Sequence, residues 1–273
     1  LESVRQYASV QLHNTISSMQ TRRRHVEYYA QFGEADFLEK LDDLQQHEWE
    51  QFGEELDNFI IAIEYATDTL ASKCCFAALK ILRMKGPASL GVEITDRVLQ
   101  MDHISSSDRK RLLITQSHFL RIGGRIQEAR KHSLDVLSLP TSDQNNPDTI
   151  SIAKESNQQD NSDFDPLLEA DIYVEQGNIE ENESLFPKAL AKYEQALTIY
   201  ERIEKPKRIA TVLLKIGGVH RSMGDYDQAL QAFTRALEIS TNHHFALLKA
   251  DTLTEIGKIH VRNGEYRSAI EHF

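Results

Sequence analysis

Residues 210–237 read ATVLLKIGGVHRSMGDYDQALQAFTRAL, and this stretch decides the fold. When the segments that start at Ala170, Ala210 and Ala250 are aligned, they repeat at a step of 40 residues. Glycine takes the eighth place in all three segments, alanine the twentieth, and aromatic residues the seventeenth and twenty-fourth. Such a period is typical of stacked supersecondary units, each of which buries its apolar surface against its neighbours.

The chemistry of the repeated places predicts the shape of each unit. Small residues at the eighth, twentieth and twenty-seventh places let two helix backbones approach closely, and the aromatic rings fill the space between them. The turns Met223–Tyr226 and Asn263–Tyr266 each centre on a glycine, which favours the left-handed conformation at a helix C-cap. Each unit is therefore predicted to be a helix–turn–helix hairpin.

The run from Ile216–Gly217 through Gly224–Leu230 to Arg235–Leu237 resembles the tetratricopeptide repeat family. This resemblance implies an all-α, right-handed superhelical solenoid of helix–turn–helix hairpins. The step of 40 residues exceeds the about 34 residues usual in that family, so we expect longer helices or longer loops. The tryptophan usual at the fourth place is replaced by Tyr173, Leu213 and Leu253.

Composition and pattern divide the chain into four parts. Residues 1–70 are predicted to hold N-terminal helices, and residues 71–139 two degenerate repeats that begin near Ser72 and Lys110. Residues 140–168 read as an acidic mobile insertion, because they have few apolar residues to bury. This insertion is interpreted as a tolerated surface addition, with a charged tether that competes for the groove as the alternative. Residues 169–273 hold three repeats, the last truncated.

The N-terminal part carries a second resemblance. Helices are expected over residues 1–12, from Arg22 to about Gly33, and from about Glu48 to Thr69. The segments LESVRQYA, RRRHVEYY and LDNFIIAIEYA, which begin at residues 1, 22 and 56, are similar in their order to a junction in bacterial multidomain signal-transduction ATPases of the NB-ARC/STAND type. In those proteins a winged-helix segment precedes a helical-repeat region. The resemblance implies that the chain is a piece of a longer protein with an upstream ATPase core.

Charge and composition narrow the classes of partner. The formal net charge is -11, and the acidic balance argues against a nucleic-acid partner. The longest apolar run is Cys74–Leu79, far shorter than the about 20 residues that span a bilayer. The start lacks a signal-peptide pattern. The two adjacent cysteines fit neither a disulfide framework nor a metal motif, so we expect buried helical cysteines, with a vicinal redox pair as the alternative, and a cytoplasmic location.

No motif for catalysis appears among the ionisable residues. The 11 histidines form no His-Glu-x-x-His pattern, and the chain has no Gly-x-Ser-x-Gly, Cys-x-x-Cys or phosphate-binding glycine loop. His220 and His260 share the eleventh place and are predicted to fill space between helices with one ring nitrogen hydrogen-bonded. The basic run Arg22–Arg24 is predicted to be a solvated helix start or a contact to the ATPase core. We therefore expect no enzyme activity, cofactor or metal.

In the family that the repeats resemble, the first helix of each hairpin lines a concave groove through places two, five, nine, twelve and thirteen. In this chain those places hold eight Lys or Arg residues and three acids, which would suit an acidic peptide. The alternative is that Lys and Arg are simply good exposed helix formers. The candidate groove residues are Lys80, Arg83, His118, Arg121, Asn178, Asn182, Arg221, Lys258 and Arg262.

These observations predict a module for protein–protein interaction rather than catalysis. We expect it to act as the sensor arm of a larger signalling ATPase or transcriptional regulator. A peptide or protein bound in the groove would change the state of the upstream core. Two other functions remain open, namely a scaffold for homo-oligomerisation and an arm that binds a small-molecule effector.

Overall fold

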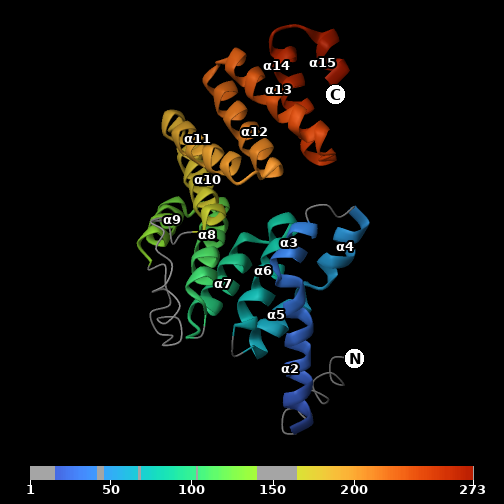
Figure 1. The fold of residues 1–273 in the computed structure, drawn as a ribbon, viewed down its shortest axis with the longest axis vertical. Helices are drawn as coiled ribbons and strands as arrows, with labels where there is room; N and C mark the ends of the chain where they lie inside the picture. The colour runs from blue at the N-terminus through green and yellow to red at the C-terminus, as the bar shows by residue number, and fades with distance from the viewer. Residues whose placement is uncertain (1–15, 42–45, 67–68, 103, 140–164, 273) are drawn as a thin grey trace, which may run out of the picture. The chain divides into compact units, whose positions relative to one another are not determined.

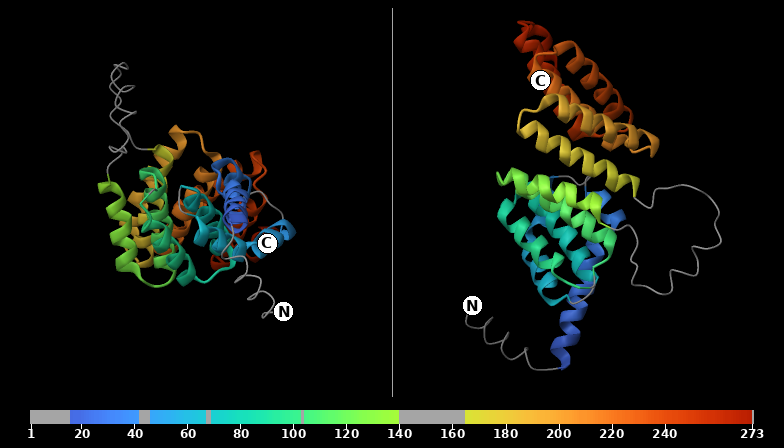
Figure 2. Two further views of the ribbon diagram at one scale, coloured as in Figure 1. Left: turned by 90° about the horizontal axis from the view of Figure 1, so that it is seen from below. Right: turned by 90° about the vertical axis from the view of Figure 1, so that its left-hand side faces the viewer.

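A computed structural model describes residues 16–41, 46–66, 69–102, 104–139 and 165–272, and every regular element in these ranges is a helix. The chain divides into two compact units, Leu1–Asn145 and Asn146–Phe273 (Figures 1 and 2). The prediction of an all-α fold built from stacked hairpins is confirmed. The helix expected over residues 1–12 and residues 140–164 of the expected insertion lie outside the described ranges.

The first unit begins with short helices and continues with two hairpins. Its elements are α2 (Ile16–Ala30), the 3-10 helix η1 (Gln31–Gly33), α3 (Ala35–Leu41), α4 (Gln46–Glu54), α5 (Leu56–Tyr65), α6 (Leu70–Lys85), α7 (Ala88–Leu99), α8 (Ser106–Ile122) and α9 (Ile126–Ser138). The hairpins α6–α7 and α8–α9 pack against each other, and α2, η1 and α5 pack against α6. Figure 1 shows these elements in blue to green.

Aromatic rings form the core of the N-terminal helices. The ring of Phe32 lies 5.0 Å from that of Phe37 and 5.8 Å from that of Phe59, which is fully buried. The single helix expected from Glu48 to Thr69 is instead two helices, α4 and α5, which meet at Glu55. The Glu55 carboxylate accepts hydrogen bonds from the Tyr29 hydroxyl at 2.6 Å and from the Asn58 amide at 2.9 Å.

The second unit consists of three hairpins. Its helices are α10 (Pro166–Asn182), α11 (Phe186–Arg202), α12 (Pro206–Met223), α13 (Tyr226–Asn242), α14 (Ala246–Arg262) and α15 (Tyr266–His272). Each helix packs against the next, as the yellow-to-red part of Figure 1 shows. From α10 to α14 the helices have 17 or 18 residues, and only two or three residues connect one to the next. The long repeat step therefore lies in the helices and not in the loops.

The junctions between these helices share one backbone conformation and one hydrogen-bond pattern. A residue with positive φ recurs every 20 residues, at Ser184, Glu204, Gly224, His244 and Gly264. The residue after each of them donates its backbone N–H to a carbonyl five residues earlier, as Asp225 does to His220 at 2.9 Å. This 6→1 bond, with a left-handed residue before its donor, is the Schellman motif that ends α-helices. Each repeat of 40 residues thus consists of two helices that end in the same motif.

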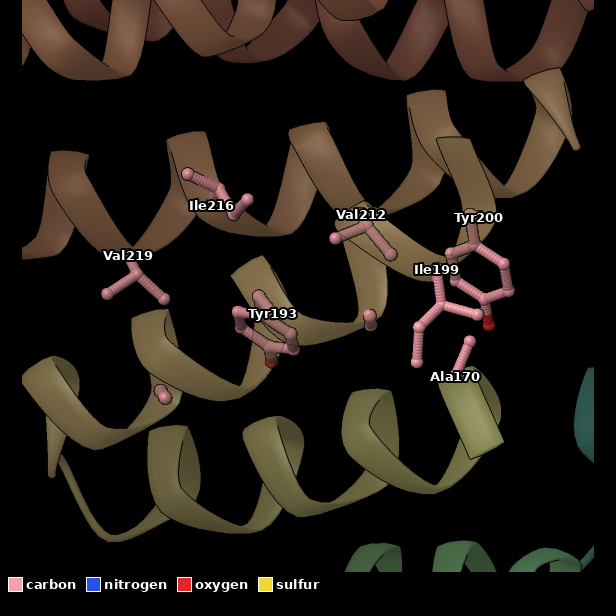
Figure 3. Close-up of a cluster of buried hydrophobic side chains, with 9 residues drawn as sticks. Ala170, Tyr193, Ile199, Tyr200, Val212, Ile216 and Val219 are labelled. Atoms are coloured by element: carbon pink, nitrogen blue, oxygen red, sulfur yellow. The ribbon is translucent and has the colours of Figure 1, made fainter. Parts of the chain in front are cut away.

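Glycine at the eighth place receives an aromatic ring from the partner helix of the hairpin. A Cβ at Gly177 would lie 2.5 Å from the Tyr193 ring, and a Cβ at Gly217 would lie 2.4 Å from the Phe233 ring. Both rings are fully buried. Figure 3 shows Tyr193 of α11 with its hydroxyl directed toward α10, in a cluster that includes Val212, Ile216 and Val219 of α12. The predicted use of small residues and rings is confirmed for these two hairpins.

Cys74 and Cys75 are both free and fully buried in α6. The Cys74 thiol donates to the Val26 carbonyl at 3.7 Å, and burial raises the pKa of the Cys75 thiol. The reading of both as core residues is confirmed. No described helix combines the length and the low polarity that crossing a bilayer requires.

Candidate functional site

The second unit carries a hollow of about 340 Å³ on the first helices of its hairpins. The residues that line it are Glu181 of α10, Leu214, Lys215, Gly218 and Arg221 of α12, and Asp251, Thr254, Glu255 and Lys258 of α14. Seven of the nine occupy places two, five, nine or twelve of their repeats. These places share one helix face because they are three or four residues apart. The other two, Lys215 and Glu255, both occupy the sixth place.

Glu255 joins two cations at one side of the hollow. Its Oε1 accepts a hydrogen bond from Lys258 Nζ at 2.5 Å, and its Oε2 lies 3.0 Å from Arg221 Nε. The Arg221 Nε and Glu255 Oε2 atoms are buried but not aligned for a hydrogen bond. The Lys258 contact is local to α14, whereas the Arg221 contact crosses from α12. One carboxylate thus ties two neighbouring hairpins together.

A polar network ties α12 to the preceding hairpin. Lys215 Nζ donates to Asn178 Oδ1 at 2.8 Å and lies 5.9 Å from the centre of the Tyr193 ring. The buried Tyr193 hydroxyl lies 2.9 Å from Asn178 Oδ1 and 2.7 Å from Glu181 Oε2, and can donate its one proton to either. Asn178 also donates to Glu175 at 3.0 Å. Helices α10, α11 and α12 therefore meet in one hydrogen-bonded group beside the hollow.

The hollow carries no excess of formal charge. Its acids are Glu181, Asp251 and Glu255, and its bases are Lys215, Arg221 and Lys258. Five of the eight Lys and Arg residues counted at the predicted groove places belong instead to the first unit. The positive field expected from the whole chain therefore does not describe this hollow. Its cations are held by specific partners.

The predicted groove residues of the second unit separate into two groups. Arg221 and Lys258 line the hollow, whereas Asn178, Asn182 and Arg262 do not. Asn178 is buried in the network described above. Asn182 is the last residue of α10 and is exposed, and the Arg262 guanidinium lies 5.7 Å from the centre of the Tyr226 ring.

The predicted groove residues of the first unit lie on α6 (Lys80 and Arg83) and on α8 (His118 and Arg121). Arg121 Nη2 is 3.0 Å from His118 Nδ1.

Place five, one of the predicted groove places, holds Phe76 in the repeat that begins near Ser72 and Ile114 in the repeat that begins near Lys110, and both residues are buried. Phe76 is 8% exposed and Ile114 is 9% exposed, and the Arg111 guanidinium lies 4.3 Å from the Phe76 ring centre. At the start of α6, Gly33 of η1 passes so close that a Cβ there would lie 1.9 Å from the Lys73 carbonyl oxygen. The start of α6 thus packs against η1, which no repeat pattern includes.

The histidines at the eleventh place and the arginine at the start of the basic run contact neighbouring side chains within their own unit. His260 Nδ1 lies 2.6 Å from Glu265 Oε2, as the expected ring hydrogen bond requires, but His220 Nδ1 lacks a hydrogen-bond partner and is 3.8 Å from Asp225 Oδ2. Arg22 lies within α2 rather than at its start, with its guanidinium 4.6 Å from the centre of the Tyr65 ring. Across the residues that the structure describes, no three His, Cys, Asp or Glu side chains form a group that could hold a metal ion.

Comparison with known proteins supports the repeat assignment. The sequence profile of the tetratricopeptide repeat family matches residues 168–242 and 208–273. No curated protein matches the sequence. The second unit thus carries tetratricopeptide repeats, which generally serve as protein–protein interaction modules.

Three solved structures illustrate the likeness of the fold. A signal transduction ATPase with numerous domains (STAND), with a tetratricopeptide repeat sensor, from Pyrococcus horikoshii is 13% identical, with a TM-score of 0.61 over 95% of this chain and 39% of that one. A Rap protein complexed with Competence and Sporulation Factor is 12% identical, with a TM-score of 0.55 over 87% of this chain and 77% of that one. BtubC from P. vanneervenii is 17% identical, with a TM-score of 0.54 over 86% and 87%. At these identities the likeness concerns the fold alone.

Proposed function

We propose that the chain is a protein-binding sensor arm that holds an acidic peptide segment of its partner in the hollow of the second unit. The observation that carries the proposal is the hollow itself, which lies on the first helices of three successive repeats and contains Arg221 and Lys258. The likeness to a STAND protein with a repeat sensor supports the further proposal that the arm belongs to a larger signalling ATPase or transcriptional regulator. The chain spans 39% of the length of that protein.

The lining of the hollow suits a peptide backbone with acidic side chains. Arg221 and Lys258 come from neighbouring hairpins and offer donors for charge-assisted hydrogen bonds, which are stronger than neutral ones. Gly218 also lines the hollow and presents no side chain, so a peptide backbone can approach α12 closely there. Leu214 and Thr254 add an apolar and a hydroxyl contact. Affinity would come from several such contacts together.

Ligand binding in this hollow would change how neighbouring hairpins are tied. Arg221 links α12 to α14 through Glu255, and Lys215 links α12 to α10 through Asn178. A bound carboxylate that takes over Arg221 would loosen the first tie and leave the second. The resulting shift between hairpins would be the signal passed to the rest of the parent protein, because a ligand acts through its different affinity for two states.

Charge reversal tests the proposal. The double variant Arg221→Glu with Lys258→Glu should weaken binding of a fluorescein-labelled hexaglutamate peptide at least tenfold, measured by fluorescence anisotropy at low salt. A matched control is Lys188→Glu with Lys249→Glu, which makes the same charge change at exposed residues outside the hollow. Circular dichroism should show unchanged helicity in both. Equal affinities of the double variant and the control would refute the proposed site.

One observation favours a second function as an oligomerisation scaffold. On the last hairpin, Leu247 is 73% exposed and Ile270 is 76% exposed, an arrangement that a second copy of the chain could cover. Light scattering across a range of protein concentrations separates the two functions. A rise in mass that Ile270→Lys abolishes would support the scaffold, and a constant monomer mass would exclude it.

A further inference from the structure

We infer that Glu255 is an internal competitor, whose carboxylate occupies the cations that a partner's carboxylate would use and so decides which acidic segments can bind. This inference rests on the proposed function of the same hollow. It names Glu255 as the residue that determines specificity, although Glu255 stands at a repeat place that the groove prediction left out. The argument follows from the contacts, the exposure and the alignment of three side chains.

The distances show that one acid lies close to both cations of the proposed subsite. Lys258 Nζ lies 2.5 Å from one oxygen of Glu255, and Arg221 Nε lies 3.0 Å from the other. The Glu255 side chain is 20% exposed, whereas Arg221 is 36% exposed and Lys258 is 49% exposed. The acid is therefore less exposed than the two cations, which reach the solvent. An incoming carboxylate would meet the cations first.

The alignment shows that Arg221 can be bound better than Glu255 binds it. Arg221 Nε and Glu255 Oε2 are close in distance, but neither atom has a hydrogen-bond partner, and both are buried. A buried donor without an aligned acceptor loses its hydration without full replacement. A carboxylate that approaches in the plane of the guanidinium can form the aligned, charge-assisted bonds that the Glu255 carboxylate does not. Exchange of one acid for the other is therefore physically feasible.

The tether of Glu255 sets the strength of the competition. A group attached to the same helix as Lys258 acts at an effective concentration on the order of millimolar or above, which a single free carboxylate at low concentration cannot match. A ligand overcomes this only when one segment brings several contacts at once. The hollow should therefore accept peptide segments with neighbouring acidic residues and reject isolated carboxylates. Glu181 and Asp251 also line the hollow, and their negative charges would repel an acidic group that is not held by Arg221 and Lys258.

Two isosteric variants separate internal competition from a general effect of charge. Glu255→Gln removes the competing charge and keeps the shape of the side chain. Glu181→Gln removes one negative charge from the same hollow, but the contact of Glu181 is with the Tyr193 hydroxyl and not with a cation. With fluorescein-labelled hexaglutamate as probe, Glu255→Gln should lower the Kd at least tenfold. Glu181→Gln should lower it by less than about threefold.

Each other outcome overturns a defined part of the argument. Equal tightening by both variants would mean that only net charge matters and would overturn the competitor role. Weaker binding by Glu255→Gln would show that Glu255 positions the cations for the ligand, which also overturns it. If the wild type binds the probe and Glu255→Gln changes nothing, the inference fails while the proposed function stands. If neither the wild type nor Glu255→Gln binds the probe, both the inference and the proposed function fail. Thermal melts confirm folding, and Glu255→Ala replaces Glu255→Gln if the latter is unstable.

Discussion

Gly217 of α12 leaves the space that the ring of Phe233 of α13 fills. A Cβ at Gly217 would lie 2.4 Å from Phe233 Cε1, whereas a Cβ at the next residue, Gly218, would meet nothing within 4 Å. Two adjacent glycines on one helix thus have opposite roles. The first allows the two helices of a hairpin to pack closely, and the second belongs to the hollow.

Alanine substitution at these two glycines should give opposite results. Gly217→Ala should lower the free energy of unfolding by roughly 1–3 kcal/mol or more, because the added methyl group overpacks a fully buried ring. Gly218→Ala should leave it unchanged or raise it by up to about 1 kcal/mol, because alanine favours a helix over glycine. Urea unfolding followed by circular dichroism measures both. Similar effects of the two substitutions would show that the packing of Phe233 does not depend on Gly217.

Replacing a non-glycine residue that has a positive φ at a helix junction with glycine should stabilise the protein. Glu204 has φ of 52° and His244 has φ of 58°, a conformation that costs a residue with a Cβ about 1–2 kcal/mol. His244→Gly should therefore raise stability by about 0.5–1 kcal/mol, after the greater entropy loss of glycine on folding is included. His244→Ala, which keeps the strain, is the matched control and should show no such gain. A lower melting temperature for His244→Gly than for His244→Ala would contradict the assigned backbone conformation.

The contact between Tyr29 and Glu55 predicts a pH dependence of stability. Hydrogen bonds from Tyr29 and Asn58 lower the pKa of Glu55 below its ordinary value of 4.5. Burial and the hydrogen bond to Glu55 raise the pKa of Tyr29 to about 12. A lowered carboxyl pKa adds stability above the ordinary pKa, and this stability is lost as the pH falls through the lowered value. Tyr29→Phe should therefore destabilise the protein more at pH 7 than at about pH 3.

Chemical denaturation of the wild type and of Tyr29→Phe at both pH values checks this expectation. Tyr28→Phe is the control, since its 55% exposed side chain should make the substitution nearly neutral at either pH. A difference between wild type and Tyr29→Phe that does not change with pH would rule out the proposed coupling to the Glu55 carboxylate.

The two cysteines should be unreactive in the folded protein. Both side chains are fully buried, and burial raises the pKa of the Cys75 thiol, so little thiolate is present to attack a reagent. A colorimetric thiol assay should detect almost no reaction under native conditions and two thiols per chain in denaturant. Rapid reaction of either thiol in the native state would restore the redox-pair alternative.

Much of the repeat architecture could be predicted because its physical causes lie close together in the sequence. The small residues Gly177 and Gly217 recur with the rings that fill their space, Tyr193 and Phe233, at fixed distances along the chain. Such a pattern is visible without coordinates. The same holds for Gly224, whose left-handed conformation ends α12.

The features that the sequence did not reveal depend on contacts between distant segments, or on backbone conformations that the residue type disfavours but the fold imposes. Glu204 and His244 adopt positive φ although neither is a glycine, and only their spacing of 20 residues from Gly224 could have revealed them. Lys215 and Glu255 reach the hollow from the sixth place because their long side chains extend from the edge of the helix face. Phe76 is buried in a unit where η1 adds contacts that no repeat position encodes.

Because the same helix-ending motif occurs at Glu204 and at His244, the connections between successive hairpins are interchangeable. Removing residues 205–244 would join two chain ends that already have the same backbone conformation and the same hydrogen bond. Gene duplication or recombination can therefore add or delete a whole hairpin without inventing a new connection. Since each hairpin also brings its own side chains to the hollow, the length of the binding surface can evolve in steps while the joints stay unchanged.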